Sequence, residues 1–350
     1  MVVHPWLATI PWALKMADPV NMKDITVDHP LLEVRNLKKY FPVRGGMFHR
    51  VVNQVRAVDG VSFTIKKGQT LGLVGESGCG KSTLGRAILR LHEPSSGEIL
   101  VNGADITGFT RQQMVVERRQ LQIIFQDPFA SLSPRRTVAQ TIREPLDVHR
   151  VGTKKDREIR VTELLDVVGM SPQVRDRYPH EFSGGQRQRI GIARALALNP
   201  EFIVADEPVS ALDVSVQSQV LNLIAKLKRE HGIAFLFISH DLAVIQHVSD
   251  EIGVMYLGQI VEHASVEDLY AGPKHPYTRA LLSAVPVPDP TRKPERIVLS
   301  GDVPSPMNPP AGCPFHTRCP DAKAICSTTP PPRRNVGSDA KPHEVSCHLY

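Results

Sequence analysis

The segment Gly75-Glu76-Ser77-Gly78-Cys79-Gly80-Lys81-Ser82-Thr83 is the clearest indication of fold class in this 350-residue chain. It matches the pattern G-x-x-x-x-G-K-[ST], in which glycines let successive N–H groups turn inward around a β-phosphate. Lys81 adds a positive charge for the phosphates, and Ser82 offers a hydroxyl to Mg²⁺. An apolar run precedes the loop and a helical run follows it. The sequence therefore predicts an α/β fold of the P-loop NTPase type, with a nucleotide site made of Gly75, Ser77, Gly78, Gly80, Lys81, Ser82 and Thr83.

Two further apolar runs, at 202–205 and 234–238, are continuous in the way expected of strands covered by helices on both faces. Asp206 and Glu207 follow the first run, and Ser239-His240 follows the second. Ligands of open α/β sheets bind at the carboxyl ends of the strands, so these residues should meet the phosphate-binding loop at one edge. We expect Asp206 to hold Mg²⁺ through water and Glu207 to polarise an attacking water molecule.

The sequence Phe-Ser-Gly-Gly-Gln at 182–186 resembles the signature motif of ABC-type ATPases. Together with the loop, the two strand ends and the segments around Gln126 and Asp213, it forms a set similar to the complete ABC ATPase set. This resemblance covers about residues 31–265. It implies an ABC ATPase domain over those residues and a use of ATP and Mg²⁺.

The resemblance also implies roles for single residues. Gln126 would belong to the Q-loop, which senses Mg²⁺ and the membrane partner, and Asp213 to the D-loop, which crosses a dimer interface. His240 would contact the γ-phosphate. Phe41 is the expected adenine-stacking aromatic, with its neighbour Tyr40 as the alternative and a plain core role open for either.

The signature motif implies a second subunit. Its serine begins a helical run, so its hydroxyl and the following backbone amides should lie at a helix N-terminus. In the family these donors contact the γ-phosphate of an ATP that the partner holds, so hydrolysis needs a head-to-tail dimer. The residues concerned are Ser183, Gly184, Gly185 and Gln186.

A helical subdomain is expected at about 131–182, because this part is too long for a loop and is patterned as helices. Thr153 and Asp156 resemble a helix start. One apolar stripe follows at i, i+3, i+4 and i+7, formed by Val161, Leu164, Leu165 and Val168. In the family such a nested subdomain docks to the cytoplasmic loops of a permease. We interpret most of its basic residues, Arg135, Arg136, Arg143 and Arg150, as a solvated face.

The segments outside the catalytic core are similar to those of the oligopeptide, dipeptide and nickel importer ATPases. Residues 272–282, 178–181 and 44–54 carry this resemblance, the last two of them to the F-type subunit of peptide importers. The implied partners are a homologous D-type ATPase subunit in a heterodimer, two transmembrane permease subunits and, indirectly, an extracytoplasmic substrate-binding protein. The implied place is the cytoplasmic face of the inner membrane, and the cargo is short peptides, with nickel chelates or other small solutes left open.

Residues 266–350 are expected to form a C-terminal extension that becomes loop-rich beyond 283, because 13 of the 29 prolines fall between 286 and 332. Four of the five cysteines lie in this tail, and Cys79 is interpreted as a small filler of the phosphate-binding loop. Disulfides suit a reducing cytosol poorly and zinc sites favour shorter gaps, although neither is excluded. Four thiolates with long, unequal gaps favour a [4Fe–4S] cluster, which the resembling subunits carry, on Cys313, Cys319, Cys326 and Cys347.

Composition fits a globular chain that works on a membrane only through partners. Hydrophobic residues make up 41% of the sequence, and no apolar run approaches the ~18 residues of a spanning helix. Residues 1–15 are interrupted by Pro5 and Pro11 and have no leading basic cluster, so we expect residues 1–30 to be a disordered tail rather than a signal peptide. The net charge of +6 leaves a soluble ABC ATPase acting on ribosomes or DNA as the rival function. We expect no nucleic-acid partner, because such translation factors generally carry two cassettes in one chain.

Overall fold

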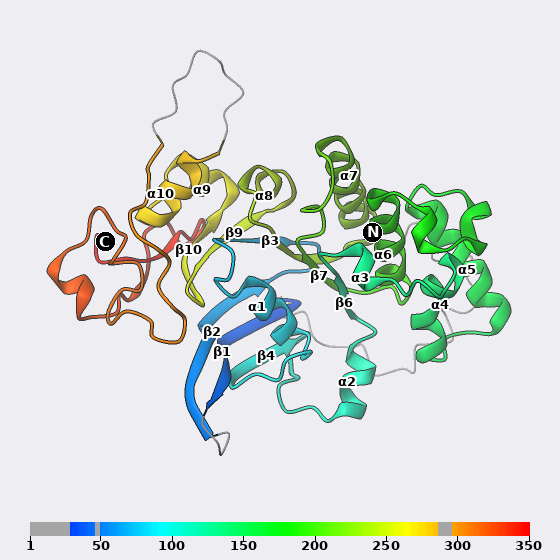
Figure 1. Cartoon of the computed structure of the whole chain (residues 1–350), viewed down its shortest axis with the longest axis horizontal. Helices are drawn as coiled ribbons and strands as arrows, with labels where there is room; N and C mark the ends of the chain where they lie inside the picture. The colour runs from blue at the N-terminus through cyan, green and yellow to red at the C-terminus, as the bar shows by residue number, and fades with distance from the viewer. Residues whose placement is uncertain (1–28, 46–49, 286–295) are drawn as a thin grey trace, which may run out of the picture.

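A central eight-stranded sheet forms the middle of the molecule in this computed structural model, which describes residues 29–45, 50–285 and 296–350 (Figure 1). The disorder predicted for residues 1–30 falls almost entirely outside the described residues. The strand order is β11-β12-β10-β9-β3-β8-β7-β6. Its members are β3 (Thr70–Val74), β6 (Leu121–Ile124), β7 (Phe202–Asp206), β8 (Ala234–Ile238), β9 (Glu251–Tyr256), β10 (Gln259–Ser265), β11 (Arg333–Asn335) and β12 (Glu344–Ser346).

The strands from β9 to β6 run parallel, and both faces of this part are buried. In β8, Phe235 and Phe237 pack into one hydrophobic cluster with the surrounding helices, while Leu236 and Ile238 pack into a second cluster on the opposite face. Side chains of a strand alternate between faces, so both faces must be apolar when helices or another sheet cover each of them. The continuous apolar runs predicted as buried strands are confirmed.

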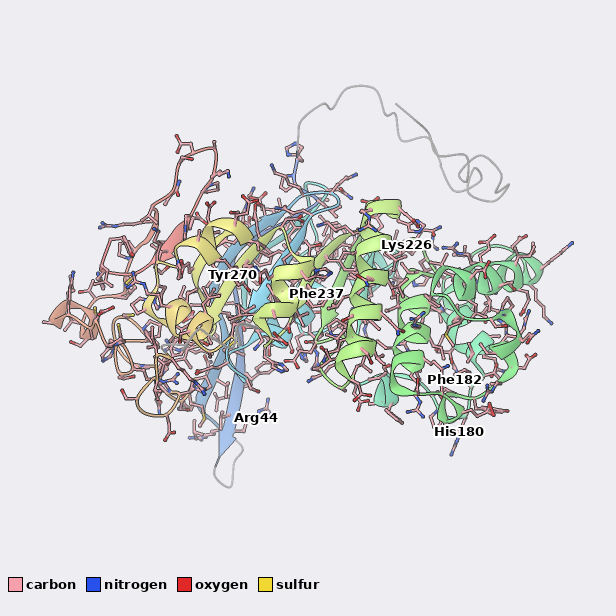
Figure 2. All side chains as sticks on the ribbon, turned by 90° about the horizontal axis from the view of Figure 1, so that it is seen from above. Arg44, His180, Phe182, Lys226, Phe237 and Tyr270 are labelled. Atoms are coloured by element: carbon pink, nitrogen blue, oxygen red, sulfur yellow. The ribbon has the colours of Figure 1, made fainter. Side chains whose placement is uncertain are left out.

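A second, four-stranded antiparallel sheet of order β2-β1-β4-β5 covers one face of the central sheet. The helix α1 (Lys81–Ile88) contributes Leu84, Ala87 and Ile88 to the cluster between the two sheets. The ends of β1 and β2 form a hairpin that projects from the molecule, where Figure 2 labels Arg44. The elements of this part are β1 (Leu32–Gly45), β2 (Arg50–Ile65), β4 (Ser96–Val101), β5 (Ala104–Asp105) and α2 (Arg111–Glu117).

The helical subdomain lies at one end of the molecule, where Figure 2 labels His180 and Phe182. Thr153 caps α5 in a reciprocal capping box with Asp156, as the sequence predicted. The predicted apolar stripe on α5 is fully buried. The elements are α3 (Pro128–Ser131), α4 (Val138–Val148), α5 (Lys154–Val167), the 3₁₀ turns η2 (Pro172–Asp176) and η3 (Pro179–Glu181), and α6 (Gly184–Leu196).

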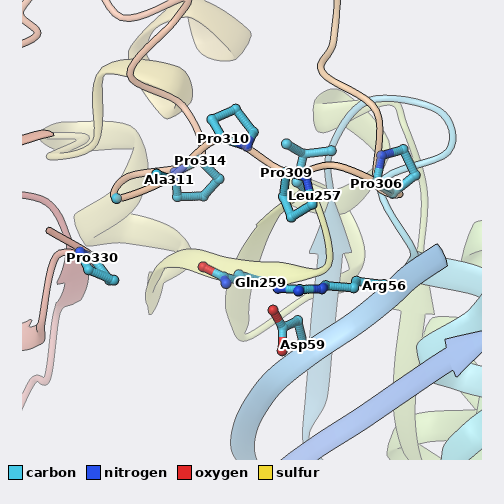
Figure 3. A pocket seen from close by; sticks show the side chains of 11 residues that line it. Arg56, Asp59, Leu257, Gln259, Pro306, Pro309, Pro310, Ala311, Pro314 and Pro330 are labelled. Carbon is cyan, nitrogen blue, oxygen red and sulfur yellow. The ribbon is translucent and has the colours of Figure 1, made fainter. Parts of the chain in front are cut away.

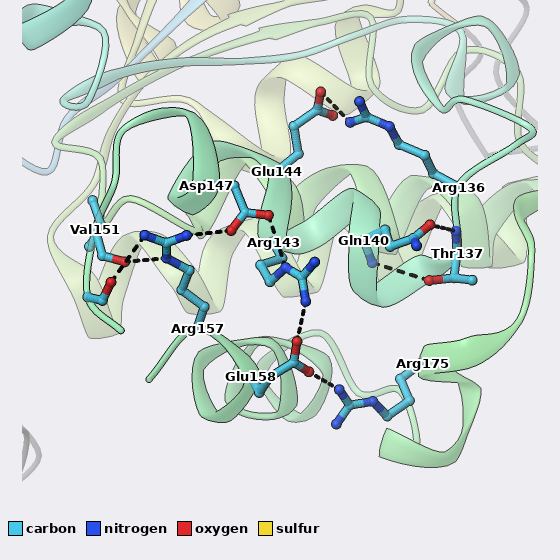
Figure 4. A network of polar contacts seen from close by, with 11 residues as sticks. Arg136, Thr137, Gln140, Arg143, Glu144, Asp147, Val151, Arg157, Glu158 and Arg175 are labelled. Atoms are coloured by element: carbon cyan, nitrogen blue, oxygen red, sulfur yellow. Dashed lines mark hydrogen bonds and ion pairs between the residues drawn. The ribbon is translucent and has the colours of Figure 1, made fainter. Parts of the chain in front are cut away.

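Ion pairs tie the helices of this subdomain together (Figure 4). Arg143 of α4 pairs with Asp147 one turn later and with Glu158 of α5, and Glu158 also pairs with Arg175 of η2. Arg136 pairs with Glu144. Of the four arginines singled out in the sequence, two therefore have carboxylate partners within the subdomain.

The remaining helices pack around the central sheet. Figure 2 shows Phe237 of the sheet between the part that contains Tyr270 and the helical subdomain. These helices are α7 (Val214–His231), α8 (Leu242–Val248), α9 (Val266–Ala271) and α10 (Pro276–Ser283), with one 3₁₀ turn, η4 (Ala324–Ser327), in the tail. Among the described helices, none combines the length and the apolar character that a membrane span requires.

The C-terminal extension contributes two strands to the central sheet. Strand β12 pairs with β10 and β11 with β12, so the tail lengthens the sheet. Glu262 of β10, buried at 1% exposure, accepts hydrogen bonds from the backbone N–H groups of Lys274 and His275 and contacts His343 Nε2 at 2.7 Å. Burial opposes ionisation, but these hydrogen bonds lower the pKa of Glu262. One ionised carboxylate thus anchors both α10 and the tail.

Burial of His275 makes this anchor sensitive to acid. The ring caps α10 by accepting the N–H of Tyr277 at Nδ1 (3.1 Å), and burial lowers the pKa of His275 to about 4. Because the unfolded chain takes up a proton near pH 6.5 and the folded chain does not, lowering the pH from 7 to 5 should cost about 2 kcal/mol at this residue. His275→Asn keeps a capping acceptor but does not titrate, so it should lose about that much less stability over the same pH step.

The measurement is the free energy of unfolding in urea, followed by circular dichroism at pH 7 and pH 5 for both proteins. His247→Asn, at an exposed position of α8, controls for the loss of a histidine as such. An equal pH-dependent loss in the wild type and in His275→Asn would contradict this prediction.

Candidate active site

The carboxyl ends of four parallel strands meet at one edge of the sheet. Leu73 of β3 lies opposite Ile238 of β8, and Ile238 lies opposite Asp206 of β7. The loop after β3, Glu207 after β7 and Gln126 after β6 therefore share one edge, as expected for the binding edge of such sheets. The convergence predicted from the sequence is found.

The phosphate-binding loop encloses the Lys81 ammonium. Lys81 Nζ donates to the carbonyls of Gly75 (2.7 Å) and Glu76 (3.0 Å), and the side chain is 4% exposed. Gly80 has φ +108°, and a Cβ there would lie 1.9 Å from the carbonyl oxygen of Ala57, so only glycine fits. The loop thus requires glycine at position 80 and leads into the N-terminus of α1, a position that favours an anion.

Cys79 of the same loop is a filler rather than a reactive thiol. Its side chain is buried, and burial raises the pKa of Cys79. A thiol of this kind stays protonated near neutrality and reacts poorly. This agrees with the interpretation drawn from the sequence.

Oxygen groups suited to Mg²⁺ lie beside the loop. Ser82 Oγ donates to Asp206 Oδ1 at 2.6 Å, and Arg86 lies 3.4 Å from the other carboxylate oxygen. Asp206 is 1% exposed. Hydroxyl and carboxylate oxygens are the ligands that Mg²⁺ prefers, so these two side chains fit the ion, which supplies positive charge for phosphoryl transfer when bound.

The expected catalytic side chains form one cluster around Glu207. Gln126 Nε2 donates to Glu207 Oε2 (2.9 Å), and His240 Nδ1 lies 3.2 Å from the same oxygen. The backbone of Glu207 has φ +46°, a left-handed conformation that costs a non-glycine residue about 1–2 kcal/mol. Its N–H donates to the carbonyl of Ile238 (3.0 Å), which holds this turn against the neighbouring strand.

The two candidate aromatics for adenine have different surroundings. Tyr40 is part of a polar contact, because its hydroxyl donates to Asp59. Phe41 is half-buried, lies edge-on to His92 at 5.5 Å between ring centroids, and has the Lys39 ammonium 4.8 Å from its ring. None of these contacts assigns adenine to either ring. Stacking of adenine on Phe41 therefore stays a prediction.

The signature motif lies at the N-terminus of α6, among the helices of the subdomain and apart from α1 (Figure 1). Ser183 is exposed and caps α6 in a reciprocal box with Gln186. A Cβ on Gly185 would lie 2.2 Å from Val216 of α7, so glycine is needed where the signature packs on the D-loop helix. Asp213 precedes α7 and is exposed as well. Ser183 and Asp213 thus face solvent rather than the phosphate-binding loop of their own chain.

The predicted metal centre in the tail is wrong. Within residues 29–45, 50–285 and 296–350, no group of three or more His, Cys, Asp or Glu side chains is placed to hold one metal ion, so neither the iron–sulfur cluster nor zinc is supported. All five cysteines are free. Burial, with smaller effects of the other tail cysteines, raises the pKa of Cys313 to about 11, so this thiol packs as a neutral apolar group. Spacing in the sequence did not show how Cys313, Cys319, Cys326 and Cys347 would be oriented.

No pattern in the sequence indicated a contact between the tail and the phosphate-binding loop. Arg318 forms a two-pronged ion pair with Glu76, and the Glu76 N–H donates to the hydroxyl of Tyr277. Arg318 lies 242 positions from Glu76, beyond the reach of any local pattern. Tyr277 lies in the segment that carried the importer resemblance, but its role was not predicted.

A cavity of about 310 Å³ opens between the β1–β2 sheet and the tail, away from the catalytic cluster (Figure 3). Arg56 and Asp59 lie on one wall, and prolines of the tail form the other. None of the predicted site residues lines it.

Comparison with known proteins agrees with this geometry. The family described as "ABC transporter" matches residues 58–210, and "Oligopeptide/dipeptide transporter, C-terminal region" matches 261–326. The chain is 56% identical over 326 residues to the oligopeptide transport ATP-binding protein AppF of Bacillus subtilis, covering 91% of this chain and 97% of that protein.

Two solved structures share the fold of the core. The ATP-binding cassette MJ0796, a dimer in a post-hydrolysis state bound to ADP and phosphate, is 28% identical with a TM-score of 0.60, over 67% of this chain and 98% of that one. CbiO1 of Clostridium perfringens, part of the ABC transporter complex CbiONQ, is 26% identical with a TM-score of 0.60, over 69% of this chain and 91% of that one.

The fold and site define an ATPase of the ABC type, which uses ATP and Mg²⁺. The chain belongs to the family of oligopeptide transport ATP-binding proteins. Membership implies that it dimerises and associates with a membrane permease, and it leaves the rival function on ribosomes or DNA without support.

The loop geometry predicts that Gly80→Ala weakens nucleotide binding. The added methyl group must displace the Ala57 carbonyl or unwind the turn, and either change moves the phosphate-binding amides. We expect an affinity loss of at least tenfold, or roughly 1.4 kcal/mol, in titrations with a fluorescent ATP analogue. Gly103→Ala is the matched control, because Gly103 also has a positive φ (+80°) but open space around its Cβ. Wild-type affinity in Gly80→Ala would show that the loop can rearrange.

Proposed function

We propose that this protein is the ATP-hydrolysing subunit of a membrane importer for short peptides. One combination supports the proposal above all others: a clustered ATP site and an oligopeptide-type C-terminal region occur in one chain that is 56% identical to an oligopeptide transport protein over most of its length. ATP binding would close two ATPase subunits against each other, and hydrolysis with phosphate release would reopen them.

The geometry supports separate roles for the side chains of the site in ATP hydrolysis. Glu207 would orient and polarise the attacking water, because its carboxylate lies between Gln126 and His240 and is not used by Ser82 or Arg86. Lys81 and the loop amides would stabilise the charge on the transferring phosphoryl group. His240, which lies 3.2 Å from the Glu207 carboxylate, would contact the γ-phosphate.

The second half of each site would come from a partner. Ser183 and Asp213 are exposed on the chain that carries them, and Val214 at the start of α7 is 79% exposed although it is apolar. Exposed donors at a helix N-terminus and an exposed apolar residue suit a surface that another subunit covers. We propose that the partner is a homologous D-type subunit rather than a second copy of this chain.

A surface near Gln126 is suited to the permease. Phe129 of α3 is 63% exposed, and the Arg187 guanidinium of α6 lies 3.5 Å from the centre of its ring. Arg187 itself is tied to the carbonyls of Pro179 and His180 just before the signature. A permease loop that pressed on Phe129 would therefore bear on both the Q-loop and the signature helix. The complex would lie on the cytoplasmic face of the inner membrane and receive peptides from an extracytoplasmic binding protein.

Glu207→Gln should keep ATP binding and abolish transport. The amide keeps the shape of the side chain but no longer attracts the proton of the attacking water, so kcat should fall at least ~100-fold while the ATP dissociation constant changes by less than about threefold. The test uses the assembled transporter in proteoliposomes, with ATP hydrolysis and uptake of labelled di- and oligopeptides measured together.

Glu201→Gln is the matched control, because Glu201 precedes the same strand at its opposite end. Near-normal hydrolysis by Glu207→Gln would remove Glu207 from the catalytic role. Uptake of nickel chelates but not of peptides would overturn the proposed cargo while leaving the ATPase assignment intact.

Ser183→Arg should separate binding from turnover. Ser183 serves the partner's nucleotide, so the variant should bind ATP like the wild type when it is alone and lose the hydrolysis that the D-type subunit stimulates. Lys81→Ala should do the reverse and lose its own ATP binding. The readouts are ATP binding by the single chain and ATPase activity during titration with the partner subunit. Equal specific activity of the wild type at high dilution and in the complex would refute the need for a partner.

A further inference from the structure

Two side chains of the C-terminal extension, Tyr277 and Arg318, hold Glu76 of the phosphate-binding loop, and Lys81 of the loop itself also bonds to it. The N–H of Glu76 donates to the Tyr277 hydroxyl at 2.8 Å. Both terminal nitrogens of Arg318 donate to its carboxylate, at 2.8 and 3.0 Å. Its carbonyl oxygen accepts from Lys81 Nζ at 3.0 Å. The C-terminal extension therefore holds Glu76 by its backbone and its side chain, while the carbonyl of the same residue orients the Lys81 ammonium.

The groups that grip Glu76 are rigidly seated. Tyr277, Tyr256 and Phe315 are fully buried and pack against one another with ring centroids 4.8 to 5.4 Å apart. Burial raises the pKa of Tyr277, so its hydroxyl stays a neutral acceptor for the loop. Arg318 follows Phe315 in a turn closed by its own N–H and the Phe315 carbonyl (3.0 Å). Its side chain is only 8% exposed.

Charge gives the ion pair a second consequence. Glu76 places a carboxylate on the loop that must wrap the triphosphate, the most negatively charged part of ATP. The two negative charges repel each other. A planar guanidinium that meets this carboxylate in a two-pronged pair neutralises it and fixes its direction. Removing only Arg318 would leave an unpaired negative charge beside the triphosphate.

We propose that Arg318 is a positioning residue for ATP binding: from the C-terminal extension it neutralises and orients Glu76, and through Glu76 it sets the phosphate-binding loop. The extension thus supports the nucleotide site directly, in addition to any contact it makes with other subunits. The inference rests on the ATP site assigned above.

Arg318→Gln should raise the dissociation constant for Mg²⁺–ATPγS roughly tenfold in the full-length chain, because Glu76 then repels the nucleotide. In the assembled transporter KM for ATP should rise while kcat at saturating ATP changes little, since Arg318 touches no reacting atom. Arg318→Lys keeps the charge but not the fork, so its affinity should lie between those of the wild type and Arg318→Gln.

The decisive variant is Arg318→Gln combined with Glu76→Gln. It removes the repelling charge together with its partner, so it should bind ATPγS at least about fivefold more tightly than Arg318→Gln alone. A tail that had merely unfolded would not be repaired by a change in the loop. Arg279→Gln is the control, because Arg279 pairs with Asp321 and the Tyr350 hydroxyl inside the extension and does not contact the loop.

Wild-type affinity in Arg318→Gln would overturn the inference. So would weak binding in Arg318→Gln that Glu76→Gln fails to relieve, because the arginine would then act only through folding of the extension. Failure of the wild-type chain itself to bind ATPγS would count against the ATP site, and this outcome is distinct from both of the others.

Discussion

The parallel register of β3, β8 and β7 is the constraint on which the site depends. Leu73, Ile238 and Asp206 lie on one line across the sheet, and the chemistry begins within two residues of that line on each strand. Because successive residues of these strands enter different hydrophobic clusters, a slip of one residue would exchange the two faces of a strand. The packing that stabilises the core therefore also fixes the distances of Glu207 from Gln126 and His240.

Two carboxylates connect the C-terminal extension to this core, with different consequences. Glu262 is buried and ties α10 and the tail to β10, so it acts on the stability of the extension. Glu76 lies on the phosphate-binding loop and pairs with Arg318 of the tail, so through Glu76 the extension acts on the nucleotide site. Burial of Tyr277 and Phe315 between these two contacts makes them parts of one packed unit.

Under the proposed function, a single chain holds only part of the machinery for hydrolysis. The loop, the Mg²⁺ ligands and the Glu207 cluster share one edge of the sheet, whereas the signature serine and Asp213 are exposed beside α6 and α7. This exposure supports the proposal that a partner subunit completes each site. Phe129 and Arg187 lie where a force on the helical subdomain would reach both the Q-loop and the signature.

Features encoded by contiguous residues could be predicted from the amino-acid sequence. Glycine spacing and Lys81 predicted the loop, and continuous apolar runs predicted β7 and β8. The pair Thr153 and Asp156 predicted the start of α5, and Ser183 predicted that of α6, because backbone conformation and local hydrogen bonds depend on near neighbours. The prediction of a metal site on the tail cysteines was wrong, because spacing along a proline-rich tail does not determine whether side chains converge. Only the tertiary structure brought Arg318 to Glu76, since a contact across 242 positions depends on how the aromatic cluster and β12 seat the tail against the core.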